Sequence, residues 1–192
     1  MDTKSLENYL KQFGQKVVDD AQLRLEKSKN ALGKPRGKTA LGASIRFEVV
    51  PDERGFTTKF FMLDYGTFLD KGVSGNKEKQ PFTNYKGVAE SSPYSYTTKG
   101  PPIDILSKWI KKKGIKPKGL GRGRSKKTGQ YLSGFAYLIS RKIKRDGIKS
   151  LTFFQKPFGE GYNELKETML KKLKLDIETY LTTFYRPKQK IK

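Results

Sequence analysis

Residues 41–63 read LGASIRFEVVPDERGFTTKFFML, and this stretch decides the predicted fold. In its first half, apolar residues alternate with small or charged ones, which is typical of a strand with one buried face. The apolar positions are Leu41, Ala43, Ile45, Phe47 and Val49. Residues 51–55 (PDERG) have the composition of a turn, and residues 56–63 follow as a second strand. The stretch therefore predicts an antiparallel hairpin.

Helical patterns flank this hairpin on both sides. Apolar residues recur every three or four positions over residues 4–29 and again over 165–184, as expected of helices that bury one face. Shorter helices are predicted at 103–110 and 132–143, and a third strand at 148–154. This order predicts the α+β class, in which N-terminal, middle and C-terminal helices and long loops pack a small antiparallel sheet. We expect one domain over residues 1–185 and a basic tail over 186–192.

The segment 64–102 has no sustained period and is rich in Gly and Pro, so we predict a long loop or arm. Its aromatic residues need a surface to pack against, either the chain's own sheet or a neighbouring subunit. We treat them as candidate inter-subunit contacts. They are Tyr65, Phe68, Phe82, Tyr85, Tyr94 and Tyr96.

The charge is large and unevenly distributed. The chain has 41 Lys and Arg against 19 Asp and Glu, a net charge of +22. Between Ile105 and Arg145 there are fourteen cations and no acid, and residues 111–130 are predicted to form a basic, Gly-rich loop. Such a segment favours an anionic partner, nucleic acid or acidic protein, over a merely solvated lysine surface. The candidate contacts are Lys108, Lys111, Lys112, Lys113, Lys116, Lys118, Arg122, Arg124, Lys126 and Lys127.

Missing residue types exclude several kinds of chemistry. The chain contains neither Cys nor His, so disulfides, thiolate or histidine metal sites and Ser-His-Asp triads are excluded. Asp64, Asp70 and Glu78 are the best carboxylate group for a metal-dependent nuclease, but they form no complete motif. We therefore predict no catalytic, cofactor-binding or metal-binding residues. The longest apolar run is Phe60–Leu63, so no membrane partner and no secretory signal are expected.

Several short motifs occur in a familiar order. The strand end Met62-Leu63-Asp64-Tyr65-Gly66-Thr67 resembles the aromatic-flanked acid-x-Gly-Thr signature of tailed-phage tail-completion, or head–tail joining, proteins. Residues 147–158 (GIKSLTFFQKPF) resemble the stretch that precedes the last helix of that family. Residues 69–75 (LDKGVSG) and 93–96 (PYSY) are also similar to family variants. The resemblance in order extends over most of residues 1–185.

This resemblance implies a non-enzymatic structural protein of the virion, made in the host cytoplasm. Its single connector-type domain would form a homo-oligomeric ring in the neck, between the portal or adaptor and the tail. The implied partners are further copies of the chain, the portal or adaptor and tail proteins, and DNA that passes through the neck. The alternative is a basic nucleic-acid-binding protein, ribosomal-type or related to DNA packaging, followed by the nuclease.

Overall fold

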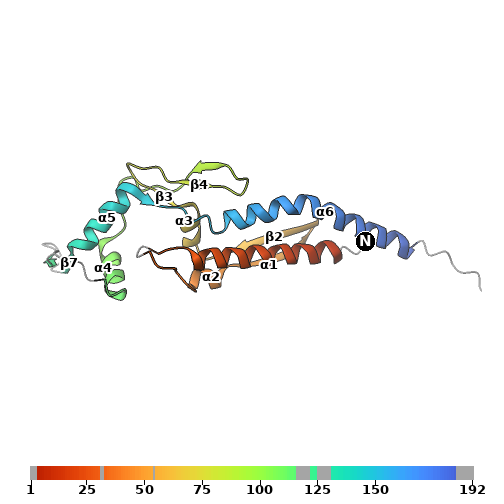
Figure 1. The fold of residues 1–192 in the computed structure, drawn as a ribbon, viewed down its shortest axis with the longest axis horizontal. Coiled ribbons are helices and arrows are strands. Elements are labelled where there is room, and N and C mark those ends of the chain that lie inside the picture. The colour runs from red at the N-terminus through yellow and green to blue at the C-terminus, as the bar shows by residue number, and fades with distance from the viewer. Residues whose placement is uncertain (1–3, 31–32, 54, 116–121, 125–130, 185–192) are drawn as a thin grey trace, which may run out of the picture. The chain divides into compact units, whose positions relative to one another are not determined.

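The computed structural model describes residues 4–30, 33–53, 55–115, 122–124 and 131–184 (Figure 1). Its helices and two-stranded sheets confirm the α+β class. The chain divides into two compact units. Unit 1 comprises Met1–Gly66, Thr83–Val88 and Thr152–Lys192, and unit 2 comprises Thr67–Phe82 and Ala89–Leu151. The single domain predicted over residues 1–185 stays a prediction, and the tail 186–192 lies outside the described residues.

The predicted hairpin is present in unit 1. Strand β1 (Arg46–Asp52) pairs with β2 (Gly55–Phe61) in an antiparallel register that places Phe47 opposite Phe60 and Glu48 opposite Lys59. Helix α1 (Lys4–Lys27) packs on the Phe47 face, where a Cβ at Gly14 would overlap the Phe47 ring. One face of the hairpin is therefore apolar and covered, as its alternation predicts.

Two long helices form the body of unit 1. Helix α6 (Gln155–Phe184) lies beside α1 and runs antiparallel to it (Figure 1). Arg24, near the end of α1, pairs with Glu160 at the start of α6, whereas Asp176, late in α6, accepts hydrogen bonds from the backbone N–H groups of Ser5 and Leu6. The predicted apolar stripe of α1 is buried, from Leu10 through Phe13, Val17 and Ala21 to Leu25.

Aromatic rings fill the space between the hairpin and the helices. The Phe60 ring lies 5.4 Å from that of Phe154, 5.7 Å from Phe158 and 6.2 Å from Phe13, measured between ring centroids, with edge-to-face geometry in each pair. Phe153 is fully buried. The rings come from α1, β2 and the segment that opens α6, so this cluster holds together parts of the chain that are distant in sequence.

The predicted start of the first strand is wrong. Residues Ala40–Ser44 form the short helix α2, capped by Thr39, whose hydroxyl accepts a hydrogen bond from the Gly42 N–H. Leu41 and Ile45 are four residues apart, so both fit one face of a helical turn as well as one face of a strand, and both are buried. The alternation from Leu41 to Ile45 therefore did not distinguish the two structures.

The segment 64–102 was predicted to be a long loop or arm. The structure instead shows a series of short elements within it. They are α3 (Tyr65–Lys71), β3 (Val73–Ser74), β4 (Pro81–Thr83) and β5 (Ala89–Ser91). Strand β4 pairs with β5, and the backbone of Ser74 exchanges hydrogen bonds with Tyr94 and Tyr96. The elements are too short to show a sequence period.

The second half of the chain also departs from the prediction at element ends. Helix α4 (Ile103–Lys112) is confirmed, but Tyr131–Ser133 form strand β7 rather than helix, and α5 is Gly134–Asp146. Strand β8 is only Gly147–Ile148, and α6 begins at Gln155 with Pro157 in its first turn, where proline is tolerated. Within the described ranges, no helix is both long enough and apolar enough to cross a membrane.

Candidate interaction site

Helix α4 exposes the first lysines of the predicted basic segment. Pro102 stands at its N-cap position, Ile110 is buried, and Gly114 follows its end with a positive φ of 65°. Lys108, Lys111, Lys112 and Lys113 are all exposed. The helix therefore buries its apolar side within unit 2 and directs its cations to solvent.

Only part of the remaining basic segment is described. Lys116, Lys118, Lys126 and Lys127 lie outside the described residues. Arg122 and Arg124 belong to strand β6 (Arg122–Arg124), which pairs with β7 in an antiparallel register. The prediction of a loop over residues 111–130 is thus wrong for Lys111 and Lys112, which end α4, and for residues 122–124. Strand β6 therefore lies beside the residues that lead into α5.

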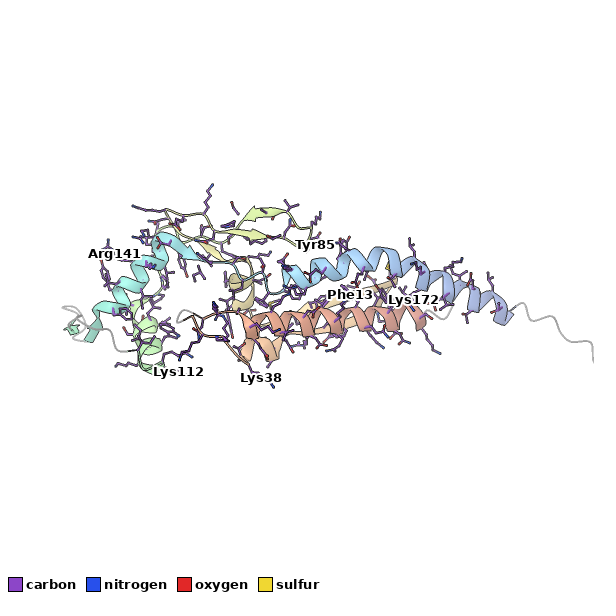
Figure 2. All side chains as sticks on the ribbon, viewed as in Figure 1. Phe13, Lys38, Tyr85, Lys112, Arg141 and Lys172 are labelled. Carbon is purple, nitrogen blue, oxygen red and sulfur yellow. The ribbon has the colours of Figure 1, made fainter. Side chains whose placement is uncertain are left out.

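A second group of cations, absent from the predicted set, surrounds the C-terminal half of α5. An open hollow of about 810 Å³ has Lys77, Arg141, Lys142, Lys144 and Arg145 in its wall. Figure 2 shows that Arg141 on α5 and Lys112 on α4 lie in different parts of unit 2. The hollow is therefore a separate cationic site. We call it the α5 hollow.

Two of these five side chains form an ion pair or a hydrogen bond within the described part of the chain. The guanidinium of Arg145 pairs with the adjacent carboxylate of Asp146, and the Lys144 ammonium donates to the carbonyl of Thr98 at 2.7 Å. The hydrogen bond with Asp146 raises the pKa of Arg145 above its ordinary value. Lys77, Arg141 and Lys142 make no ion pair within the described part of the chain, so their charges remain available.

The sequence contained a partial signal for this site. Arg141 and Lys142 belong to the acid-free run that ends at Arg145, but the Gly-rich part of that run drew the prediction toward residues 108–127. Lys77 lies 64 residues before Arg141 in the sequence, and nothing local connects the two. Only the fold brings Lys77 to α5.

Most of the predicted aromatic contacts also have roles within the chain. The Tyr85 ring packs against those of Phe158 and Tyr162 at 5.6 and 5.7 Å, and Phe82 is buried, with 6% of its surface exposed. Burial raises the pKa of Tyr96 above its ordinary value. These three side chains therefore fill the protein's own interior in whole or in part.

Of the other three aromatic candidates, Tyr94 is half-buried, whereas Tyr65 and Phe68 are exposed. Phe68 packs edge to face on Tyr94 with ring centroids 4.5 Å apart, yet 42% of its surface is exposed, and Tyr65 is 47% exposed. Tyr65 and Phe68 are the members of the predicted set best placed to meet another molecule. Their role as inter-subunit contacts stays a prediction.

The carboxylates of the nuclease alternative differ in their environments. Asp70 is almost completely buried in α3, with 2% of its surface exposed, whereas Asp64 and Glu78 are exposed. Among the described residues, no three Asp or Glu side chains are grouped so that they could hold a metal ion.

No family model, curated protein or solved structure matches this chain.

Proposed function

We propose that this chain is a non-enzymatic structural protein of a tailed-phage virion. It assembles as a homo-oligomeric ring in the neck, between the portal or adaptor and the tail. Its partners are neighbouring copies, the proteins above and below the ring, and DNA that passes through the neck. It is made in the host cytoplasm and remains in the virion.

The position of the family-like motifs supports a structural role. Residues 64–67 lead from β2 into α3, and the second motif contributes Phe153, Phe154 and Phe158 to the interior of unit 1. Both motifs therefore serve the framework of the molecule.

The observation that carries the proposal is a row of exposed apolar side chains on α6. Leu170, Ile177 and Leu181 are 66%, 41% and 48% exposed. They are seven and four residues apart, so they share one side of the helix. This row runs past Asp176, which caps the first turn of α1, and α6 continues for about two turns beyond that point. We assign the row to contact with a second copy of the chain, because a ring buries such surface between neighbours.

The test is the oligomeric state of the purified full-length protein. We expect rings in negative-stain images and a multiple of the 21.9 kDa chain mass by light scattering. The triple variant Leu170→Gln, Ile177→Gln, Leu181→Gln should give a folded monomer, because each substitution removes apolar surface from the contact without disturbing a buried side chain.

A matched control removes three exposed apolar residues elsewhere in unit 1. Leu23 on α1, Val88, and Leu175 on a different side of α6 from the row are 47%, 54% and 47% exposed, and their replacement by Gln should leave the rings intact. Circular dichroism checks that both triple variants fold. Rings that survive in the variant of Leu170, Ile177 and Leu181 would contradict the proposed contact. A monomer that binds nucleic acid and never assembles would favour the nucleic-acid-binding alternative.

A further inference from the structure

We propose that the α5 hollow binds the phosphate backbone of a nucleic acid, with Lys77, Arg141 and Lys142 as the contacting cations. This inference goes beyond the proposed ring, which rests on α6, and depends on different residues. It assigns a binding site that the basic segment 108–127 does not contain.

Main-chain hydrogen bonds hold the two sides of the hollow together. At the end of α5, the carbonyls of Lys144 and Arg145 accept from the N–H groups of Asn76 and Lys77 at 2.8 and 3.0 Å. These are carbonyls that a helix end leaves without partners of its own. A Cβ at Gly75 would overlap the Arg145 carbonyl, so the close approach requires glycine. The backbone of Lys77 is therefore fixed beside α5 before any ligand arrives.

The local charge balance leaves the hollow positive. Asp146 is held by Arg145, whose hydrogen bond is the main cause of the lowered pKa of this carboxyl, and Lys142 and Lys77 contribute to the same lowering. The Asp146 carboxylate thus interacts with three cations, Arg145, Lys142 and Lys77. A second acid, Glu78, lies close enough to Arg145 for its charge to raise the pKa of Arg145. Arg141 adds a further positive charge.

The apolar and aromatic lining of the hollow suits a polymer that carries sugars and bases. Tyr137, Leu138 and Ile103 line the hollow together with the cations, and the Arg141 guanidinium lies over the Tyr137 ring, 5.7 Å from its centroid. The Tyr137 side chain is 48% exposed. An exposed ring among cations offers a stacking or sugar contact beside the phosphate contacts.

The composition of the surface favours nucleic acid over an acidic protein. Protein interfaces are depleted in Lys, whereas two of the three available cations here are Lys. Unit 2 as a whole has nineteen Lys and Arg against five Asp and Glu, so it carries +14 of the net charge of +22. The regular phosphates of a nucleic acid match such an excess and release counterions when they bind.

The experiment measures binding of the full-length protein to a fluorescent DNA duplex of random sequence, about 20 base pairs long, over a range of salt concentrations. The variant Lys77→Gln, Arg141→Gln, Lys142→Gln should bind about 10-fold more weakly or worse. The slope of log affinity against log salt should fall by about two to three, one for each lost phosphate contact. Glu78→Gln should bind more tightly than wild type, because it removes the opposing charge.

The matched control removes the same charge from unit 1. Lys29, Lys38 and Lys59 are exposed, and their replacement by Gln should change the affinity by no more than about threefold. Circular dichroism and light scattering on every variant show that fold and assembly are retained. Equal weakening in the two triple variants would overturn the site, because binding would then follow net charge alone.

Two other probes separate the possible ligands. Poly-glutamate replaces the duplex in one series, and inorganic phosphate in another. Binding of poly-glutamate that depends on the same three cations, without duplex binding, would assign the hollow to an acidic protein and overturn the proposal. Binding of inorganic phosphate alone would overturn it as well. Intact rings without duplex binding would reject this inference and leave the proposed function standing.

Discussion

At the scale of single residues, Asp176 joins the two long helices of unit 1. Asp176 is 4% exposed, and its carboxylate accepts from the backbone N–H groups of Ser5 and Leu6 at 3.2 and 3.0 Å. These N–H groups belong to the first turn of α1 and have no partner within that helix. Burial by itself raises the pKa of Asp176, but the hydrogen bonds from Ser5 and Leu6 and the nearby charge of Lys172 outweigh it. The pKa therefore lies below its ordinary value.

We expect Asp176→Ala to lower the free energy of unfolding by about 1–2 kcal/mol at neutral pH, as the loss of a helix cap does. Asp176→Asn keeps an acceptor but loses the charge, so it should cost less. Because the folded-state pKa is lowered, the contribution of the charge is complete above the unfolded pKa of about 3.9 and is lost as the pH falls through the folded value. Urea titrations at about pH 7 and about pH 2.5 should show the gap between wild type and Asp176→Asn closing in acid. A gap that is independent of pH would contradict this role.

Gly159 marks a close approach of two segments within unit 1. A Cβ at this position would overlap the carbonyl of Tyr85, whose N–H donates to the side chain of Gln155 at 3.0 Å. We expect Gly159→Ala to destabilise the protein by about 1–3 kcal/mol, because the turn at 83–88 has to move away from α6. The neighbouring exposed position provides the control, since Asn163→Ala should change stability by less than about 0.5 kcal/mol. Thermal melts of the two variants measure the difference, and equal melts would refute the packing argument.

At the scale of elements, the segment 64–102 behaves as part of the fold. The N–H of Ser74 donates to the Tyr94 carbonyl and the N–H of Tyr96 donates to the Ser74 carbonyl, both at 2.8 Å, while Phe82 is buried. We expect the amides of Ser74 and Tyr96 to exchange slowly with deuterium, because exchange requires these hydrogen bonds to open. The amides of Lys86 and Gly87 donate only to Asn84 within an exposed turn, at 2.9 and 3.0 Å, so they should exchange faster and serve as the reference. Fast exchange throughout residues 72–97 would instead indicate that this segment is a mobile arm.

At the scale of the whole molecule, the net charge of +22 opposes compaction. Added salt screens this repulsion, so the melting temperature should rise between about 50 mM and about 300 mM NaCl. We expect a rise of about 2–4 °C, which corresponds to about 1 kcal/mol for a chain of this size. The variant Lys77→Gln, Arg141→Gln, Lys142→Gln should show a smaller rise, because it carries less charge in unit 2. A melting temperature that falls with salt would mean that attractive ion pairs dominate instead.

Local patterns in the sequence were sufficient for features that repeat along one element. The stripe from Leu10 to Leu25 spans several helical turns, and the antiparallel hairpin follows from the alternation before residues 51–55 together with the turn composition of those residues. The α+β class and the concentration of positive charge also follow from residue order alone. These features depend on near neighbours in the chain, and each pattern is repeated often enough to be recognised.

The tertiary structure alone decided the features that depend on distant contacts. Leu41 and Ile45 satisfy either a helix or a strand, and the Thr39 cap with packing beneath it selects α2. Strands of two residues, such as β3 and β8, are too short to carry a period and exist because each pairs with the other across the fold. The α5 hollow arises in the same way, since main-chain bonds to the end of α5 bring Lys77 beside Arg145. Its cations form a site because residues 76 and 77 bond to the end of α5, and local sequence preferences do not determine that contact.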